Sequence, residues 1–395
     1  MRTEVSDILD RLRHSLGIRA SEPGLKSYYL HEPTLGETEK QYLASCIDSG
    51  FVSSVGKYVD QFEKDLERVT GAKKAVVCVN GTSALHIACL LAGVKANDEV
   101  MLPSLTFVAT ANAVAYCHAI PHFVEASAQT LNVDPRKLEE YLSRNCVVRD
   151  GFCYNQKTSR KITALINVHI FGHIGEVELL KTVCEKFHIE LIEDAAESLG
   201  SLYNNRPSGS IGKLSTLSFN GNKIVTTGGG GAVLCADEQT GMRAKHLTTT
   251  AKKPHPYLYV HDEVGFNYRM PNLNAALGCA QLEKLEKWVK QKRSLAQRYL
   301  AAFQGCDSAF IFSEPEHSTS NYWLNALVLK KDDLKLRDEL LAQTNSAKIH
   351  TRPIWEPMHT LPMYQQCPRM DLTVTESLCR RVVNLPSSPF LIEKL

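Results

Sequence analysis

One lysine and one aspartate have the types and the spacing needed for chemistry in this sequence of 395 residues. Lys223 lies in the segment SFNGNKIVTTGGGG, between the polar end of an expected strand and a run of glycines. Asp194 ends the earlier apolar run IELIED, about one strand, loop and strand before the lysine. Because most lysines are solvated surface charges, Lys223 taken alone would be interpreted in that way.

Asp194 and Lys223 together indicate a specific chemistry if both side chains contact one aromatic cofactor. An enzyme that uses pyridoxal phosphate (PLP) needs a carboxylate facing the ring nitrogen, because the protonated ring withdraws electrons from the substrate. It also needs a lysine that reaches the cofactor aldehyde and acts as a nucleophile and then as a general base. We therefore interpret Asp194 and Lys223 as the candidate catalytic residues of a PLP enzyme.

Alternating strands and helices are expected to bring these two residues together. The apolar patterns predict buried strands with helices between them. The predicted strands are 75–79, 99–103, 120–125, 163–172 and 189–196, and the predicted helices are 38–46, 59–68, 82–93, 107–117 and 176–187. This order predicts an α/β fold with a mainly parallel sheet and a site at the carboxyl ends of its strands. The polar stretch 144–161 is interpreted as an insertion.

The sequence divides into three regions. Residues 1–30 predict a short helix and an extended connector, which we interpret as an N-terminal extension. Residues 31–275 are the predicted PLP-binding large domain. Residues 276–395 are predicted to form a smaller C-terminal α/β domain, and one long helix at 272–303 is expected to lead into it. Its further predicted elements are a strand at 325–330 and a helix at 332–344.

Composition argues against several classes of protein. The net charge of +2 without a long basic block argues against nucleic-acid binding, so small molecules are the expected partners. The 12 cysteines are scattered without a CxxC pair, so neither disulfides nor a metal site is expected. No apolar run has the length of a membrane span, and the first residues carry no signal-like apolar stretch. We therefore expect a cytoplasmic protein that does not associate with membranes.

A turn from strand to helix offers a candidate phosphate site. Gly81, Thr82 and Ser83 follow the predicted strand 75–79, and backbone N–H groups and hydroxyls at a helix N-terminus bind phosphate. An ordinary N-cap is the simpler interpretation of these three residues alone. The glycines at 228–231 lack the context of a GxxxxGK[ST] or GxGxxG loop, so we interpret them as a tight turn beside the cofactor.

An ordered set of motifs resembles the sugar aminotransferases of the DegT/DnrJ/EryC1/StrS family from about residue 30 to the end. The motifs are GTSALH (81–86), TFVATANAV (106–114), EDAAES (193–198), SFNGNK (218–223), TTGGGG (226–231) and GFNYRM (265–270). The sequence is most similar to the 4-aminotransferases of the bacillosamine and legionaminic acid routes, through FVSSVGKYVDQFE (51–63) and TRPIWEPMH (351–359). The resemblance implies the fold-type-I, aspartate aminotransferase-like architecture and a homodimer with shared active sites.

The resemblance also assigns residues to the cofactor. Phe107 matches the aromatic residue that stacks on the ring, although a lone Phe is usually part of a core. Glu197 would lie near the ring hydroxyl or the substrate, where many relatives carry Gln or His. Ser218 resembles a further phosphate ligand, with a routine strand hydroxyl as the alternative. Asn267 resembles the residue that reaches the phosphate of the neighbouring subunit, and the alternative is a loop that caps the following helix through Asn272 or Asn274.

Several residues are candidates for contacts with the substrate. A nucleotide diphosphate needs cationic and stacking partners, which favours Arg352 and Trp355. The other candidates in the same cluster are His350 and His359, and Tyr268 and Arg269 belong to the GFNYRM segment. A polar loop with His317, Asn321 and Tyr322 could also border the sugar, and His169 is either near the site or a satisfied histidine at a strand end. His317, His350 and His359 have no HxxxH or HxH partner with an accompanying acid, so no metal site is predicted there.

The resemblance implies transamination in two halves, with L-glutamate as the amino donor. Lys223 would move a proton in each half, and the acceptor would be a UDP-linked 4-keto-6-deoxy-N-acetylhexosamine that becomes a 4-amino sugar for surface glycan biosynthesis. A 3-aminotransferase on the same fold remains an alternative. A sugar dehydratase of this fold would carry histidine in place of Lys223, and a non-catalytic regulator would be expected to lose Asp194 or Lys223. A Rossmann oxidoreductase would need a glycine fingerprint that the first strands lack.

Overall fold

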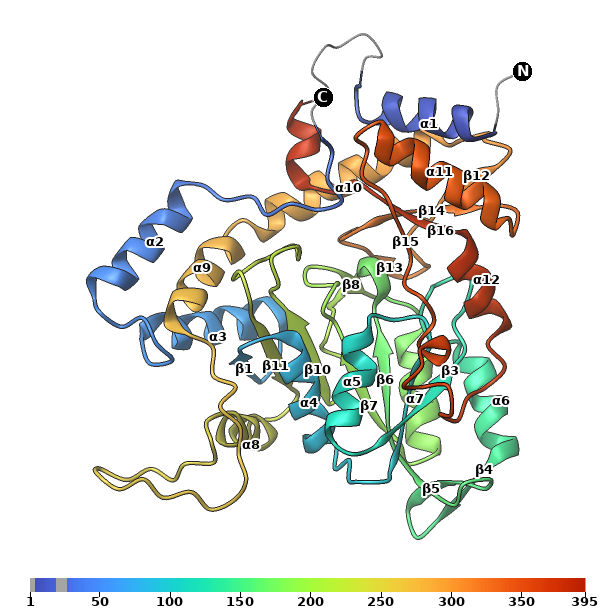
Figure 1. Cartoon of the computed structure of the whole chain (residues 1–395). Helices are drawn as coiled ribbons and strands as arrows, with labels where there is room; N and C mark the ends of the chain where they lie inside the picture. The colour runs from blue at the N-terminus through green and yellow to red at the C-terminus, as the bar shows by residue number, and fades with distance from the viewer. Residues whose placement is uncertain (1–3, 19–26, 395) are drawn as a thin grey trace.

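A nine-stranded sheet forms the centre of the lower half of the molecule in Figure 1. The computed structural model describes residues 4–18 and 27–394. The order of the main strands is β1-β11-β10-β7-β6-β2-β3, and the hairpin β4–β5 joins the sheet through β6. The strands are β1 (Lys74–Cys78), β2 (Glu99–Pro103), β3 (Ile120–Val124), β4 (Cys146–Arg149), β5 (Phe152–Asn155), β6 (Lys161–Val168), β7 (Glu190–Asp194), β10 (Leu214–Ser218) and β11 (Gly231–Cys235).

The strand directions confirm a mainly parallel sheet. β3, β2, β6, β7 and β10 pair in parallel, whereas β11 runs antiparallel to both of its neighbours, β10 and β1. The stretch expected to be an insertion forms the antiparallel hairpin β4–β5. The buried carboxylate of Glu99 anchors this hairpin, because it accepts hydrogen bonds from Asn155 Nδ2 (2.9 Å) and Thr158 Oγ1 (2.6 Å).

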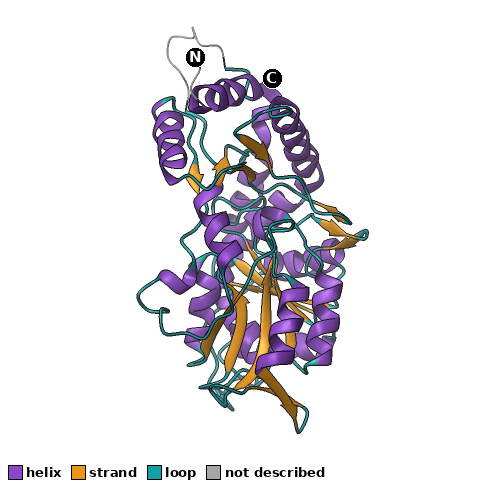
Figure 2. Cartoon of the chain, turned by 90° about the vertical axis from the view of Figure 1, so that its right-hand side faces the viewer, coloured by secondary structure: helices purple, strands orange, loops and turns teal. Residues whose placement is uncertain are grey.

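Helices cover both faces of the sheet, as the turned view in Figure 2 shows. Alternate residues of one strand pack into different cores, since side chains of a strand point to opposite faces. Val76 of β1 packs with the first group of helices and Val77 with the second. The first face carries α4 (Gly81–Leu91), α5 (Val108–Tyr116) and α8 (Glu238–Thr248), and the second carries α3 (Lys57–Thr70), α6 (Pro135–Asn145), α7 (Val177–Lys186) and α9 (Asn272–Leu282). Burial on both faces explains the continuous apolar runs of these strands.

A four-stranded antiparallel sheet forms the upper half of the molecule (Figure 1). Helix α1 packs there, because Ile8 and Leu12 share one core with Leu295 and Tyr299. The strands, in sheet order, are β12 (Ala309–Ile311), β14 (Asn325–Leu329), β16 (Val382–Leu385) and β15 (Arg352–Pro353). The helices around them are α1 (Glu4–Ser15), α10 (Leu285–Ala302), α11 (Leu334–Ser346) and α12 (Thr373–Arg381), while α2 (Glu37–Asp48) packs on α9. The short strands β8 (Leu202–Tyr203), β9 (Arg206–Pro207) and β13 (Ser318–Thr319) form a third sheet.

The prediction of one long helix at 272–303 is wrong. The chain forms α9 and α10, which are separated by Glu283 and Lys284. The two helices serve different cores, since α9 packs beside α3 whereas the second half of α10 packs against the small sheet. Lys284 is held at the break, because its Nζ lies 2.6 Å and 2.7 Å from the two carboxylate oxygens of Glu39. The sequence carries neither Gly nor Pro at this point, so its apolar pattern could not locate the break.

Within residues 4–18 and 27–394, no helix is both long enough and apolar enough to cross a membrane.

Gly231 provides a test of how the sheet edge is packed. A Cβ at this position would lie 2.5 Å from the backbone of Asn80, where the chain leaves β1. We expect Gly231→Ala to lower the free energy of unfolding by about 1–3 kcal/mol, since overpacking forces the backbone to move. Urea unfolding would measure the change. Gly221→Ala is the matched control, because its Cβ would meet only Gly228 O at 3.9 Å, and we expect a change below about 0.5 kcal/mol there. Equal effects in the two variants would contradict the explanation.

Candidate active site

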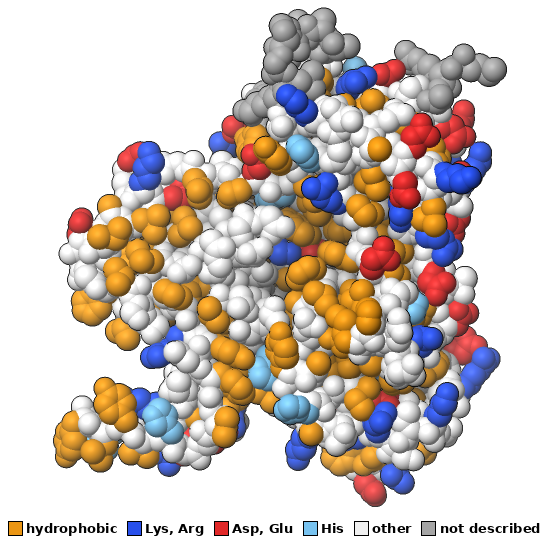
Figure 3. Space-filling view, viewed as in Figure 1, with side chains coloured by type: hydrophobic (Ala, Val, Ile, Leu, Met, Phe, Trp, Pro, Cys, Tyr) orange, Lys and Arg blue, Asp and Glu red, His pale blue; other side chains and the backbone are white. Residues whose placement is uncertain are grey.

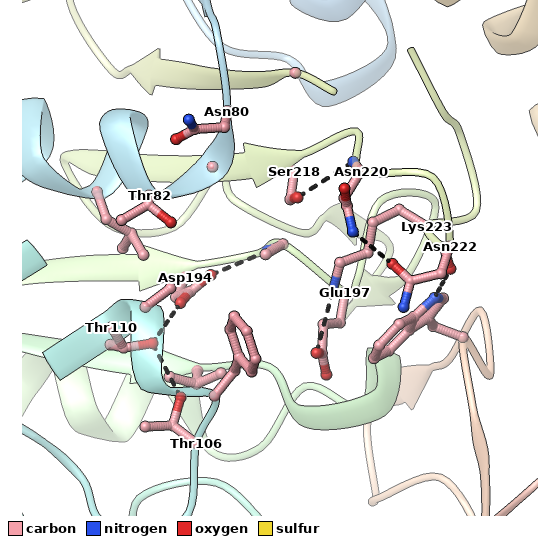
Figure 4. A pocket seen from close by; sticks show the side chains of 18 of the residues that line it. Asn80, Thr82, Thr106, Thr110, Asp194, Glu197, Ser218, Asn220, Asn222 and Lys223 are labelled. Carbon is pink, nitrogen blue, oxygen red and sulfur yellow. Dashed lines mark hydrogen bonds and ion pairs between the residues drawn. The ribbon is translucent and has the colours of Figure 1, made fainter. Parts of the chain in front are cut away.

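A cavity of about 450 Å³ opens at the carboxyl ends of β7 and β10. This volume lies in the range that binds cofactors and small molecules. Figure 4 shows polar side chains from the starts of α4 and α5, from the strand ends and from the loop after β10 pointing into it. The lining residues are Asn80, Gly81, Thr82, Leu85, Thr106, Phe107, Ala109, Thr110, Val168, Asp194, Ala196, Glu197, Ser218, Asn220, Asn222, Lys223, Gly229, Gly230, Trp323 and Trp355.

Asp194 lies on the floor of the cavity, at the last position of β7. Its side chain is buried and accepts hydrogen bonds from Thr110 Oγ1 (3.0 Å) and from the N–H of Ala196 (3.2 Å). Burial raises the pKa of Asp194, although these bonds and the charge of Lys223 act in the opposite direction. A carboxylate in this position is stabilised by a further cation in the cavity, and a protonated ring nitrogen provides one.

Lys223 points into the same cavity from the loop after β10 (Figure 4). Its Nζ lies 3.2 Å from Glu197 Oε1 and 3.8 Å from the centre of the Trp323 ring. The other carboxylate oxygen of Glu197 accepts the N–H of Phe171 at 2.8 Å. Burial raises the pKa of Glu197, and the charge of Lys223 opposes that effect. Two neighbours therefore hold the lysine amine at the edge of the cavity.

The start of α4 forms the candidate phosphate site. Asn80 is the N-cap, and its side chain accepts the N–H of Ser83 at 2.7 Å. Gly81 and Thr82 line the cavity together with Ser218 at the end of β10, whereas the buried Ser83 does not line it. A Cβ on Gly81 would lie 2.9 Å from the Cβ of Ser218, so only glycine lets the helix start approach the strand this closely. Backbone N–H groups at the first turn of a helix attract phosphate.

The three parts fit PLP. A helix start that suits its phosphate, a buried carboxylate that suits its ring nitrogen and a lysine that suits its aldehyde lie around one cavity. Phe107 also lines that cavity and is 55% exposed, so it is available for stacking and is not part of a core. The capping interpretation of Thr82 and Ser83 does not hold, because Asn80 is the cap.

The GFNYRM candidates do not line this cavity, although they pair with Cys78 and Val79, just before Asn80. Tyr268 and Arg269 follow Asn267 on the chain that returns past α8. The hydroxyl of Tyr268 lies 3.2 Å from His86 Nδ1, and Arg269 Nε donates to Asn267 Oδ1 at 3.0 Å. Within one chain these residues do not line the candidate site, so contact with a neighbouring subunit stays a prediction.

Only Trp355 of the four candidates at 350–359 lines the cavity. His350 stacks on Tyr29 with ring centres 4.7 Å apart. Arg352 donates to the backbone of Thr351 and to Asn345. His359 is buried, where its Nδ1 lies 2.8 Å from Ser104 Oγ and its Nε2 lies 3.2 Å from Glu376 Oε1. Arg352 lies in β15 and His359 in a short 3-10 helix (Met358–Thr360), so closeness in sequence did not bring these four side chains to one place.

The remaining polar candidates have structural partners. His169 is fully buried and its Nε2 lies 2.9 Å from Glu193 Oε2, as expected of a satisfied histidine at a strand end. Asn321 donates to the carbonyl oxygens of Glu197 and Leu199. Tyr322 is buried and His317 is exposed.

Several residues that line the cavity were not among the residues predicted from the sequence. Asn80 had a usable signal, because Asn directly after a strand and before a helix is a preferred N-cap. Thr110 lies one helical turn after Phe107, so a helix beginning at Phe107 would have placed both on one face. Trp323 had no local signal, since it approaches Lys223 from a segment distant in the chain. The residues missed were Asn80, Thr106, Thr110, Asn220, Asn222 and Trp323.

Comparison with known proteins decides the family. Residues 33–394 match the model of the DegT/DnrJ/EryC1/StrS aminotransferase family. The chain belongs to this family. It is 35% identical to the GDP-perosamine synthase of Vibrio cholerae, over 92% of this chain and 95% of that protein. It is also 28% identical to the dTDP-4-dehydro-2,3,6-trideoxy-D-glucose 4-aminotransferase of Saccharopolyspora spinosa, over 92% of each.

A solved structure confirms the fold. The crystal structure of a DegT DnrJ EryC1 StrS aminotransferase from Brucella abortus superposes with a TM-score of 0.81 at 25% identity, covering 90% of this chain and 93% of that one. The expected fold-type-I architecture is thereby confirmed. The chain is a PLP-dependent enzyme of a nucleotide-sugar aminotransferase family.

Asp194 should make stability depend on pH in the cofactor-free protein. Because folding raises its pKa, its contribution to stability is complete below the pKa of the unfolded chain and is lost as the pH rises through the folded-state pKa. We expect Asp194→Asn to gain stability relative to wild type as the pH rises from about 4 to about 8, in urea unfolding. The same variant should bind PLP about tenfold more weakly, in an absorbance titration.

Asp237 provides the control with the opposite sign. Hydrogen bonds from Thr240 lower the pKa of this half-buried N-cap residue, so its contribution is present above the unfolded pKa and is lost as the pH falls. Asp237→Asn should therefore lose stability relative to wild type as the pH rises from about 2 to about 4, below the range in which Asp194→Asn gains it. Parallel curves for the two variants would contradict the assignment.

Proposed function

We propose that this enzyme transfers the amino group of L-glutamate to the keto carbon of a nucleotide-linked 4-keto-6-deoxy sugar and gives a 4-amino sugar. The observation that carries the proposal is one cavity holding Lys223, Asp194 and the candidate phosphate site at the start of α4. The proposed setting is cytoplasmic biosynthesis of a surface glycan. The 4-position is supported by the name of the relative from Saccharopolyspora spinosa.

Each lining residue has a role in this proposal. PLP, when bound, supplies an electron sink beside the carbon that gains or loses a proton. Gly81, Thr82 and Ser218 would hold its phosphate, and Asp194 would face its ring nitrogen. The amine of Lys223, once free, accepts the proton from the donor carbon and returns one in the second half. Glu197, at 3.2 Å from that amine, keeps it oriented toward the cavity.

The nucleotide has two candidates. The resemblance at 51–63 and 351–359 favours a UDP-linked 4-keto-6-deoxy-N-acetylhexosamine, as in the bacillosamine and legionaminic acid routes. The relative from Vibrio cholerae is named for a GDP-linked sugar, which favours GDP as the second candidate. The polar residues that line the cavity are assigned to PLP, so they favour neither UDP nor GDP.

A panel of acceptors tests the function. Purified enzyme with PLP and L-glutamate would be mixed with UDP-, GDP- and dTDP-linked 4-keto-6-deoxy sugars and with a 3-keto sugar nucleotide. We expect one class of 4-keto sugar to gain an amino group, as read by product mass, with NMR to locate the amine. Lys223→Ala should reduce turnover by at least about a thousandfold, because the same group is nucleophile and general base.

Other outcomes would replace the proposal. Amination only at C3 would favour the 3-aminotransferase, and loss of water without amination would favour the dehydratase. Wild-type rates in Lys223→Ala would refute the role of Lys223. Wild-type protein that binds PLP but converts no sugar would favour a regulator.

We also propose a homodimer with shared sites. Lys223 is the only Lys, Arg or His among the described residues that line the cavity, whereas both substrates bring negative charges. We therefore expect further cations to approach from a neighbouring subunit. The arm at 252–264 supports an interface, because Tyr257 and Tyr259 are 79% and 83% exposed. Figure 3 shows hydrophobic side chains gathered on the projecting segment at its lower left. Asn267 and Arg269, at the base of this arm, are the residues that we expect to act on the other subunit's site.

Complementation between two inactive variants tests the shared site. One parent carries Lys223→Ala, and the other carries Asn267→Ala with Arg269→Ala. If residues 267 and 269 serve the opposite cavity, a heterodimer has one intact site out of two, so activity should appear after the subunits are mixed and exchanged. Each homodimer alone is the control. Exchange that is verified by mass spectrometry and yields no activity would contradict the shared site.

A further inference from the structure

Trp323 contacts the candidate catalytic lysine from the half of the molecule that holds the small sheet. The face of its indole ring lies 3.8 Å from Lys223 Nζ, and the side chain is buried at the wall of the cavity. A cation over an indole face is attracted by the electrons of the ring, and the attraction grows when water is excluded. Glu197 contacts the same amine at 3.2 Å. The lysine is therefore held between a carboxylate and an aromatic ring.

The indole also fixes the backbone that carries the lysine. Trp323 Nε1 donates to the carbonyl oxygen of Asn222 at 2.8 Å, one residue before Lys223. The N–H of Lys223 donates to the carbonyl of Asn220 at 2.9 Å and closes a turn. One side chain thus controls both the loop and the end of the lysine side chain.

Trp323 is itself held by the turn that precedes it. Its N–H donates to Asn321 Oδ1 at 2.7 Å, while Asn321 Nδ2 donates to the carbonyl oxygens of Glu197 and Leu199. A Cβ on Gly172 would lie 1.9 Å from Asn321 Oδ1, so the loop after β6 presses directly on this turn. The position of Trp323 is therefore tied to the segment that carries Glu197.

A second lysine, which does not line the cavity, is hydrogen-bonded to the backbone of Trp323. Lys292 lies in the middle of α10 with no exposed surface. Among the described residues its hydrogen-bond partners are two backbone carbonyl oxygens, that of Trp323 at 3.0 Å and that of Ser387. Burial lowers the pKa of Lys292 well below its usual range. Burying an amine without a carboxylate is expensive, and its two hydrogen bonds to backbone carbonyl oxygens offset part of that cost.

We propose that Trp323 is a positioning residue for Lys223 and that Lys292 holds Trp323 in place. The inference rests on the proposed function only in that Lys223 moves the proton. The small-sheet half of the molecule thereby supplies a wall that keeps the free amine within reach of the donor carbon and of the cofactor. A displacement of about 1 Å at a reacting group lowers a rate by up to about a hundredfold.

The first test uses the protein without cofactor. Acetic anhydride would label the amines, and peptide mass spectrometry would give the rate at Lys223. We expect Trp323→Leu, which removes both the ring face and the N–H donor, to raise labelling of Lys223 about threefold or more. Trp323→Phe should give a smaller rise because a ring face remains. Lys292→Met should act in the same direction. Trp288→Phe, a buried tryptophan outside the cavity, is the matched control and should change nothing.

The second test follows the first half of the reaction in stopped-flow absorbance with L-glutamate, protonated or deuterated at the α-carbon. We expect Trp323→Leu to slow this half about tenfold or more and to enlarge the isotope effect, because proton transfer becomes the slow step. PLP affinity should stay within about threefold of wild type, since the phosphate and ring contacts are intact. If wild type takes another amino acid instead, that donor replaces glutamate.

The outcomes separate the two proposals. Wild-type labelling and isotope effects in Trp323→Leu, matching Trp288→Phe, would overturn the positioning role while leaving the function intact. Wild-type protein that accepts no amino donor would overturn the proposed function, and the labelling of the cofactor-free protein would still decide the role of Trp323.

Discussion

The parallel pairing of β7 with β10 is the constraint on which the active site depends. Thr216 of β10 lies opposite Asp194 of β7, so the chain that leaves β10 begins beside the buried carboxylate. Ser218 then faces the start of α4, and the following turn carries Lys223 back over the cavity. Since parallel strands end at the same edge, one strand pair sets the distances among acid, phosphate site and lysine.

The charges of the site are arranged for a ligand rather than for the empty protein. Asp194 and Glu197 are both buried, and burial raises the pKa of each. Lys223 compensates part of this cost, and a bound cationic ring would compensate more. The two buried carboxylates therefore lower the stability of the cofactor-free protein, and cofactor binding would offset this loss. Such perturbed groups are typical of functional sites.

The large sheet and the four-stranded small sheet approach each other at the active site, and a close contact between their loops shapes the cavity. Gly172 can approach Asn321 only because it lacks a Cβ, and its φ of +96° suits glycine. This contact lets Trp323 reach Lys223, while Trp355 lines the cavity from the same half of the molecule. The large sheet thus supplies the cofactor site, and the segments around the small sheet enclose the lysine.

The sequence by itself determined the elements and the residues within short segments. Strands buried on both faces produce continuous apolar runs, and the motifs at 81–83, 194–197 and 218–223 lie directly at their carboxyl ends, so local pattern sufficed for them. Tertiary structure alone decided which distant side chains join them. Trp323 enters the cavity whereas His350, Arg352 and His359 do not, because entry depends on how the two sheets pack and on the direction in which the local backbone points each side chain. The break between α9 and α10 was decided in the same way, since two separate cores, and no helix-breaking residue, end the helix there.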